Sequence, residues 1–176
     1  YRPTVRTYNV VPVYQMKRSV LVEASVRNQL DTQQRELFID NLRRFLKAEV
    51  APHYDDWESS GIWPRSLWNR LGEEGFLCVD MPETYGGYGV SFELSAAIVD
   101  EVSREGFGAL ASGLSVHSDI VAPYILNLGS EEQRQTWLPK MASGEAVGAI
   151  GMSEPGAGSD LQGIRTAAIK DGDDYC

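Results

Sequence analysis

Residues that crosslink a chain or bind metal are scarce in this sequence. Its 176 residues include two cysteines, Cys78 and Cys176, and two histidines, His53 and His117. Two cysteines so far apart exclude a disulfide framework and fit a reducing compartment or a bacterial cytosol. Two isolated histidines also lack the ligand spacing of the common zinc sites. The acidic pair 55–56 beside His53 is interpreted as the solvated end of a helix.

Basic residues are also few, with 16 Lys and Arg against 25 Asp and Glu and a net charge of -9. Because phosphate backbones are bound by clustered Lys and Arg, this balance argues against nucleic-acid binding. No uninterrupted apolar run approaches the length that spans a bilayer. Hydrophobic residues nevertheless make up 43% of the chain, which is typical of a folded globular protein.

Acidic residues are nearly absent from the first thirty positions. Residues 1–27 hold five basic side chains and one acidic one, Glu23, so the negative charge is concentrated in the rest of the chain. Two interpretations of residues 1–30 fit this composition. They are an acid-poor targeting segment, or sequence upstream of a start at Met16.

Helical periodicity dominates the chain after residue 30. It predicts a helix that ends at Pro52, a second that begins near Pro64, and a third that Ser91 caps. The density of Pro and Gly predicts a loop over 80–89. The tryptophans Trp57, Trp63, Trp68 and Trp137 are expected to be packing anchors. Side chains expected to face inward are Phe38, Leu42, Phe45, Leu46, Val50, Leu67, Leu71, Leu94, Ile98 and Val102.

A fourth predicted helix covers 112–128, and Ser130 and Gln133 form the pattern of a capping box for a fifth. Pro139 is expected to shorten or bend the fifth helix. His117 stands alone in the fourth helix and is interpreted as a packed or surface histidine. Periodicity favours a buried core face on this helix, made of Val116, Ile120, Val121, Tyr124, Ile125 and Leu128.

The chain changes character after Gly144. Residues 146–152 are small and apolar without helical spacing, which predicts a buried strand, and 165–170 predict another. The segment 171–174 has the composition of a turn, so that Tyr175 would open the following strand.

These elements predict a mainly α protein in three parts. They are an N-terminal extension over 1–30, an α-helical domain over 31–145, and the first strands of a β domain over 146–176. A β-hairpin with no sheet to join is marginally stable. The β domain is therefore expected to be truncated.

A glycine-rich loop over 151–160 would follow the first predicted strand. Gly156 and Gly158 permit positive φ, which lets successive N–H groups point to one side and cradle a phosphate. A plain turn between strands explains the same glycines. The loop lacks the third glycine of the dinucleotide-binding fingerprint, and no P-loop lysine follows it.

Five motifs, in order and at suitable spacing, resemble landmarks of the acyl-CoA dehydrogenase family. The segments 112–117 and 158–163 look closest to its long-chain branch. The resemblance extends from about residue 31 to residue 176. The five motifs are LGEEGFL over 71–77, PETYGG over 82–87, LGSEEQ over 128–133, LPKMASG over 138–144 and AIGMSEPGAGSD over 149–160.

The resemblance implies an enzyme built from a helical domain, a β domain and a C-terminal four-helix bundle. It implies FAD bound between the last two parts, usually in a homotetramer. The implied reaction is α,β-dehydrogenation of acyl-CoA thioesters in fatty-acid β-oxidation. A glutamate removes the α-proton, the β-hydride passes to flavin N5, and electrons leave to an electron-transfer flavoprotein. A bacterial member would be cytoplasmic, and a eukaryotic member would lie in the mitochondrial matrix.

The resemblance also implies cofactor contacts in the glycine-rich segment. Ser153 matches the family's Thr or Ser that hydrogen-bonds the flavin ring, and Ile150, Gly151 and Met152 match the strand beside that ring. Ile150 stands where some members carry Tyr. Ser159 matches the serine that reaches the phosphate region of FAD or CoA, which makes it both a cofactor and a substrate contact.

Two further family features bear on this chain. Glu154 matches a structural glutamate and is not expected to act as a base. The face of the fourth helix that carries Val116 and Tyr124 matches the helix that lines the acyl-chain channel, so channel and core remain alternatives for it.

No catalytic residue is expected in this chain. It ends before the strand that backs the flavin and before the bundle that supplies the family's catalytic glutamate, so we expect it to be inactive and to bind FAD weakly by itself. Two other functions fit the sequence. They are another flavoenzyme of the same fold, such as an acyl-CoA oxidase or a flavin monooxygenase, and a non-enzymatic helical interaction module.

Overall fold

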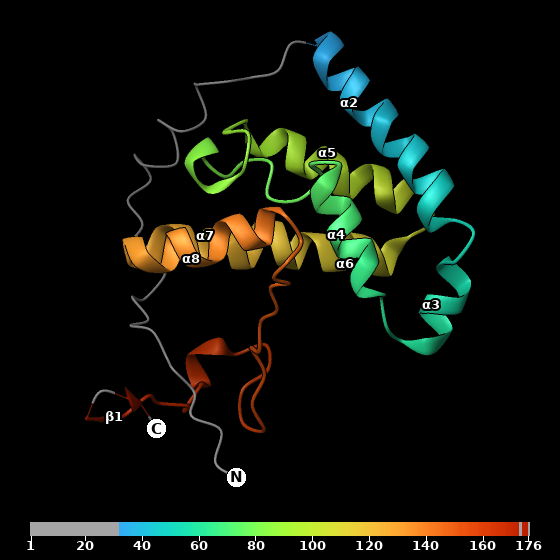
Figure 1. The fold of residues 1–176 in the computed structure, drawn as a ribbon. Helices are drawn as coiled ribbons and strands as arrows, with labels where there is room; N and C mark the ends of the chain where they lie inside the picture. Colours follow the sequence, from blue (N-terminus) through green and yellow to red (C-terminus); the bar gives the residue numbers. More distant parts are fainter. Residues whose placement is uncertain (1–31, 173, 176) are drawn as a thin grey trace.

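The computed structural model describes residues 32–172, 174 and 175, and helices make up most of it (Figure 1). The predictions for residues 1–30 and for Cys176 lie outside these residues. The elements in chain order are α2 (Thr32–Phe45), η2 (Leu46–Val50), α3 (Tyr54–Ser60), α4 (Arg65–Glu73), η3 (Glu83–Tyr85), α5 (Phe92–Arg104), α6 (Gly108–Ser115), η4 (Val116–Val121), α7 (Ala122–Leu128), α8 (Glu131–Ala142), η5 (Leu161–Gly163), β1 (Lys170–Asp171) and β2 (Asp174–Tyr175).

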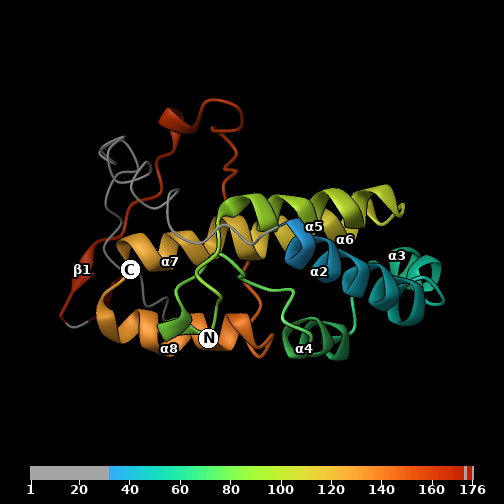
Figure 2. The ribbon, with the colours of Figure 1, turned by 90° about the horizontal axis from the view of Figure 1, so that it is seen from above.

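The long helix formed by α6, η4 and α7 is the centre of the helical body. α5 lies along α6, α2 packs against α5, and α8 runs back beside α7 (Figures 1 and 2). α3 was not predicted as a helix, but its first turn carries the exposed acidic pair 55–56, which confirms that this pair marks a solvated helix end. The segment after α8 extends away from this body (Figure 1).

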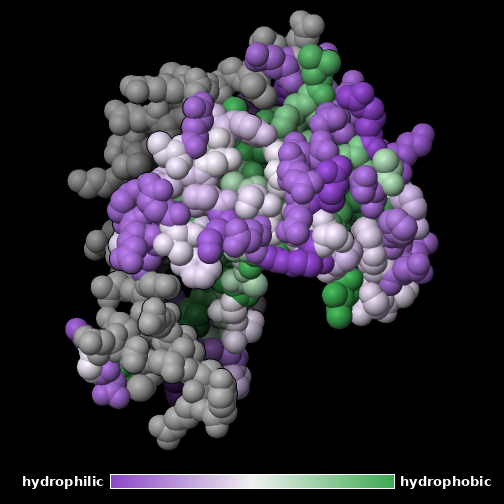
Figure 3. Space-filling view, in the orientation of Figure 1, coloured by the Kyte–Doolittle hydropathy of each residue, from purple (hydrophilic) through white to green (hydrophobic). Residues whose placement is uncertain are grey.

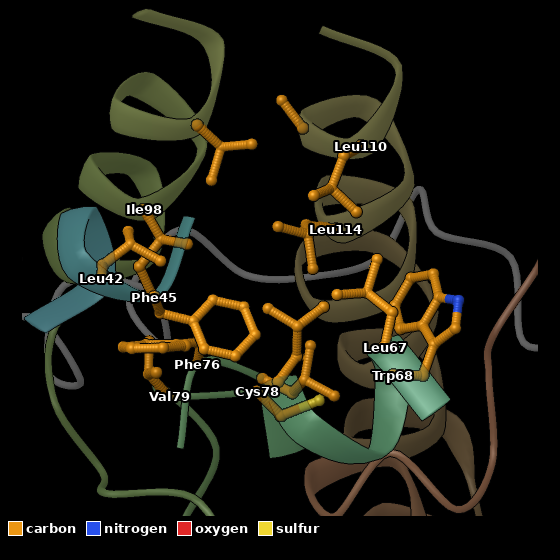
Figure 4. Close-up of a cluster of buried hydrophobic side chains, with 14 of the residues drawn as sticks. Leu42, Phe45, Leu67, Trp68, Phe76, Cys78, Val79, Ile98, Leu110 and Leu114 are labelled. Atoms are coloured by element: carbon orange, nitrogen blue, oxygen red, sulfur yellow. The ribbon is translucent and has the colours of Figure 1, made fainter. Parts of the chain in front are cut away.

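The core is built from the apolar faces that the periodicity predicted for the first three helices. Leu42, Phe45, Leu67, Trp68 and Ile98 are buried in one cluster (Figure 4). Phe76, from the turn after α4, packs edge-on against the rings of Phe38 and Phe45, with centroids 5.5 and 5.4 Å apart. Edge-to-face packing of this kind adds to the stabilisation that burial alone provides.

One ion pair joins α2 to α5 at the rim of this core. Nε and Nη2 of Arg43 donate to the two carboxylate oxygens of Glu101, at 2.6 and 2.9 Å, and Nη1 donates to Asp40 at 2.9 Å. Glu101 is 7% exposed. The paired guanidinium therefore satisfies a carboxylate whose burial would otherwise be costly.

The central helix differs from its prediction in register. It begins at Gly108, four residues earlier than predicted, and η4 is a π-helical turn. A π turn adds one residue to the helix and rotates the following side chains by about 100°. The predicted core face is half-buried rather than buried, and Tyr124 is 41% exposed, although Val121 and Ile125 pack against the core cluster. The buried face is Leu110, Ala111, Leu114, His117, Ser118 and Ala122.

This helix, Gly108–Leu128, is the one helix among the described residues that is long and apolar enough to cross a membrane, judged by length and composition alone. A helix of this kind was not expected from the sequence, which has no uninterrupted apolar run of that length. Its inner face carries His117 and Ser118 and packs against α5 and α8 within the helical body.

The capping box before α8 is confirmed. The Ser130 hydroxyl accepts from the Gln133 N–H at 3.3 Å, and the Ser130 N–H donates to the Gln133 side-chain oxygen at 2.7 Å. Pro139 lies inside α8, which continues to Ala142.

The buried strand predicted over 146–152 is wrong. These residues have no regular structure, and Val147, Ile150 and Met152 are 38%, 37% and 43% exposed. A strand needs a neighbour for its N–H and C=O groups, and no described residue pairs with this segment as a strand. The strand predicted over 165–170 is reduced to β1, which pairs antiparallel with β2 across the predicted turn at Gly172.

Candidate functional site

The predicted cofactor residues lie together on the segment that follows the helical body. Ile150, Gly151, Met152, Ser153 and Ser159 are all exposed. Among the described residues, neither the Ser153 nor the Ser159 hydroxyl has a hydrogen-bond partner. The segment therefore offers apolar side chains and free hydroxyls on one short stretch of backbone. Apolar residues gather on the surface below the helices, along the start of this segment (Figure 3).

A tight turn follows Ser153. The N–H of Glu154 donates to the carbonyl of Ala157 at 2.9 Å, and the N–H of Ala157 donates back at 3.1 Å. Ala157 is 2% exposed, and Asp160 caps the next turn by accepting from the N–H of Gln162 at 3.2 Å. The glycine-rich loop therefore has a defined backbone path.

The Glu154 carboxylate closes this loop onto the chain beyond it. Its two oxygens accept from the backbone N–H groups of Arg165 and Thr166, each at 2.9 Å. The hydrogen bond from Arg165, followed by those from Thr166, holds the pKa of Glu154 below its usual value. An ionised carboxylate with both oxygens occupied is a poor proton acceptor, which agrees with the structural role expected for Glu154.

His117 anchors the start of the segment. Its Nδ1 accepts a hydrogen bond from the N–H of Gly148 at 3.0 Å, two residues before Ile150. Because Nδ1 is the acceptor, the proton of the neutral ring is on Nε2, which lies 3.1 Å from the carbonyl oxygen of Met141 and donates to it. The ring also packs against Trp68, with centroids 5.3 Å apart. His117 is thus a packed histidine with both nitrogens used.

Burial holds His117 in its neutral form. Burial lowers the pKa of the ring, which outweighs the hydrogen bond to Met141 that raises it. The nearby positive charge of Arg65 lowers the pKa further. The Cys78 sulfur lies 3.7 Å from Nε2, and burial raises the pKa of that thiol to about 12. Both groups are therefore uncharged near neutral pH.

Sequence reasoning did not predict the role of His117. Its partners, Met141 and Gly148, are 24 and 31 residues away. A lone histidine between Val116 and Ser118 gave no indication of them. The one available signal was a polar ring within an apolar helix, which is compatible with either a packed or a surface position.

A second polar group, Asp80, is half-buried in the turn before η3. Asp80 has one carboxylate oxygen without a hydrogen-bond partner, and burial, with a smaller contribution from the charge of Asp119, raises its pKa to about 6. The Ser95 hydroxyl donates to Asp119 and the N–H of Cys78 donates to Ser118. No cluster of His, Cys, Asp and Glu that would hold a metal occurs in the described part of the chain.

The helical body, with its exposed glycine-rich extension, matches a known class of protein. The model of the family described as "Acyl-CoA dehydrogenase, N-terminal domain" matches residues 32–145. The chain belongs to the acyl-CoA dehydrogenase family. This confirms the family predicted from the five motifs and the mainly α fold.

Individual relatives extend the match beyond the helical body. The long-chain specific acyl-CoA dehydrogenase of Sus scrofa mitochondria is 44% identical over 140 residues, which are 80% of this chain and 32% of the relative. The corresponding protein of Mus musculus is 38% identical over 155 residues, or 88% and 35% of the two chains. The chain therefore spans about a third of the length of these relatives.

Solved structures agree with the sequence relatives. An acyl-CoA dehydrogenase from Geobacillus kaustophilus is 48% identical with a TM-score of 0.76, covering 85% of this chain and 38% of that one. A glutaryl-CoA dehydrogenase from Mycobacterium smegmatis, in complex with FADH2, is 31% identical with a TM-score of 0.74, covering 81% and 36%.

Proposed function

We propose that the protein carrying this chain is an FAD-dependent acyl-CoA dehydrogenase that introduces an α,β double bond into fatty acyl-CoA thioesters. The segment 150–153 is the observation that carries this proposal. It presents two exposed apolar side chains and an unpartnered hydroxyl, and it follows a backbone anchor on His117. Membership of the family, and the relative solved with FADH2, support the cofactor.

The residues of this segment suit the edge and face of a flavin ring. Ile150 and Met152 are 37% and 43% exposed, and packing against an aromatic ring would remove this apolar surface from water. The Ser153 hydroxyl would hydrogen-bond the polar edge of the ring, and Ser159 would reach a phosphate of FAD or CoA. When bound, the flavin supplies the acceptor for the hydride that leaves the β-carbon of the substrate.

The proton acceptor for this reaction lies, in our proposal, outside this chain. Glu154 is the acidic side chain nearest in sequence to Ser153, and both of its oxygens already accept backbone N–H groups. Asp80 is half-buried in the turn before η3, away from the glycine-rich segment in sequence, and one of its carboxylate oxygens is buried. We therefore expect this chain alone to be inactive and to bind FAD weakly.

The wider assignments follow from the family. We propose long-chain acyl-CoA thioesters as substrates, supported by the mammalian long-chain relatives. We propose an electron-transfer flavoprotein as electron acceptor and a homotetramer as the assembly. A chain solved in work on the electron-transferring flavoprotein of Acidaminococcus fermentans is 33% identical to this chain, with a TM-score of 0.73. We propose the cytoplasm in a bacterial source and the mitochondrial matrix in a eukaryotic one.

The test uses the protein expressed from the complete reading frame that contains this chain. We expect it to purify with flavin absorbance and to be bleached anaerobically by palmitoyl-CoA. Ser153→Ala should weaken FAD binding by up to about tenfold, the effect of one hydrogen bond, whereas Ser66→Ala, at an exposed position of α4, should not. Fast reoxidation of the reduced enzyme by O₂ would instead identify an oxidase. A protein without flavin, or without bleaching by any acyl-CoA, would contradict the proposal.

A further inference from the structure

Gly148 is the last point at which the helical body holds the chain before the predicted flavin segment. The N–H of Ala146 donates to the carbonyl of Lys140 at 2.8 Å, and the N–H of Gly148 donates to His117 at 3.0 Å. Among the described residues, none of 149–153 hydrogen-bonds to the helices. The hydrogen bond to His117 therefore fixes where the segment departs.

The absence of a side chain at Gly148 lets the backbone approach this anchor closely. A Cβ there would lie 2.8 Å from Cγ1 and 2.9 Å from Cβ of Val121, and 2.9 Å from Cε of Met141. Val121 is β-branched and sits on the central helix, so it has little freedom to move away. The same helix thus holds Gly148 by a hydrogen bond from one turn and by packing from the next.

The π turn places His117 for this role. Residues of η4 are wound more loosely than those of an α-helix, and His117 and Ser118 face the core while Val121 faces the departing segment. Nε2–H of His117 is occupied by the carbonyl of Met141 on α8. The ring therefore joins the central helix, the end of α8 and the backbone at Gly148.

We propose that His117 is a positioning residue for flavin binding: by accepting from Gly148 and donating to Met141, it sets the position from which residues 150–153 meet the cofactor. This inference rests on the proposed function, because the segment it positions is the proposed flavin contact. Each nitrogen has a separate task. The Nδ1 acceptor holds the segment, and the Nε2 donor holds the ring.

Two substitutions separate these tasks. The side-chain amide of Asn reaches the place of Nδ1, so His117→Asn keeps an acceptor for Gly148. The amide of Gln reaches the place of Nε2, so His117→Gln keeps the donor to Met141 and leaves Gly148 unbound. Val147→Ala, next to Gly148 and 38% exposed, is the matched control. Gly148→Ala keeps the histidine and displaces the backbone by its contact with Val121.

The first measurement is hydrogen exchange of the backbone amide at position 148 in the 176-residue chain, which needs no flavin. We expect exchange to rise about tenfold in His117→Gln and in Gly148→Ala, and to stay within about twofold in His117→Asn and Val147→Ala. The amides of α8 should keep their exchange rates in all four variants. Equal exchange at Gly148 in the Asn and Gln variants, or a parallel rise across α8, would overturn the proposal.

The second measurement is FAD affinity and the flavin spectrum of the protein from the complete reading frame. We expect weaker FAD binding and a shifted visible band for His117→Gln, with recovery of both in His117→Asn. If that protein contains no flavin, the proposed function fails while the Gly148 exchange result stands. If it contains flavin and both variants bind FAD as the unmodified protein does, the positioning role fails and the proposed function stands.

Discussion

The carboxyl group of Asp80 lowers the free energy of unfolding by an amount that depends on pH. Burial and the charge of Asp119 raise its pKa from 3.8 to about 6. In the unfolded chain the group loses its proton near 3.8, whereas in the folded chain it keeps the proton until about 6. The folded state is therefore progressively disfavoured as pH rises from 4 to 6 and stays so above that range.

We predict that Asp80→Asn stabilises the protein at pH 8 and not at pH 4. The full shift corresponds to about 3 kcal/mol, and partial exposure reduces the expected gain to about 1–2 kcal/mol. Urea unfolding at the two pH values measures it. Glu105→Gln, at an exposed position, is the control for loss of one charge. An equal gain at pH 4 and pH 8 would show that the amide acts through packing rather than through the proton.

Polar residues that are buried or half-buried are the part of this molecule that sequence reasoning predicts least well. His117 and Asp80 owe their properties to groups 24 or more residues away, such as Met141 and Asp119. No local pattern encodes such partners, because tertiary packing alone brings them together. By contrast, the structural role of Glu154 was predicted from the family motif, and its partners, Arg165 and Thr166, lie on the same loop.

At the scale of single elements, the capping box of α8 gives a direct test. Ser130→Ala removes the acceptor for the N–H of Gln133 and should lower the free energy of unfolding by about 1 kcal/mol. Ser130→Gly should lower the free energy of unfolding by only about a few tenths of a kcal/mol, because glycine is tolerated at this position. Thermal unfolding followed by circular dichroism measures both. If Ser130→Ala causes no loss, the hydroxyl contributes nothing at this helix start.

The contact between α4 and the end of α8 depends on glycine. Gly144 has φ +74°, and a Cβ there would clash with the backbone carbonyl of Trp68. Gly61 has a similar φ of +69° with open space around it, so it isolates the cost of the backbone conformation.

We predict that Gly144→Ala lowers the free energy of unfolding by about 3 kcal/mol and Gly61→Ala by about 1 kcal/mol. The smaller value is the strain of a left-handed conformation, and the difference is the cost of the steric overlap. Chemical denaturation of the two variants gives the comparison. If both variants lose the same amount, α4 and α8 do not pack as closely as the structure shows.

The elements differ in how far local sequence determined them. The helices α2, α4 and α5 followed from apolar spacing, since each buries one continuous face, and the start of α8 followed from Ser130 and Gln133. The central helix was misassigned in register because the π turn of η4 breaks the 3.6-residue period that the prediction assumed. The segment 146–152 has the composition of a strand but no pairing partner among the described residues, and strand formation depends on that partner.

At the scale of the molecule, the helical body and the glycine-rich extension differ in their ties to the core. Most buried apolar residues belong to the helices and to the turn after α4, whereas Ala157 is the one buried apolar residue among the described residues of the extension. The extension is held within itself by Glu154, and to the helices by the Gly148 hydrogen bond. Such a division predicts that the two parts open with different free energies.

Limited trypsin digestion tests that division in the 176-residue chain. Within residues 32–172 we expect the first cuts after the exposed Arg165 and Lys170, leaving a resistant product that ends at Arg165. Cuts after Arg43 and Arg104 should be about 100-fold slower, because helices must first open locally at a cost of about 3 kcal/mol. Mass spectrometry of the time course identifies the ends. Glu154→Ala should speed the cut after Arg165 and leave those in the helices unchanged, because its carboxylate holds the N–H groups of residues 165 and 166. If Arg43 or Arg104 is cut first, or if Glu154→Ala speeds every cut alike, the helical body and the extension unfold as one unit and the division is wrong.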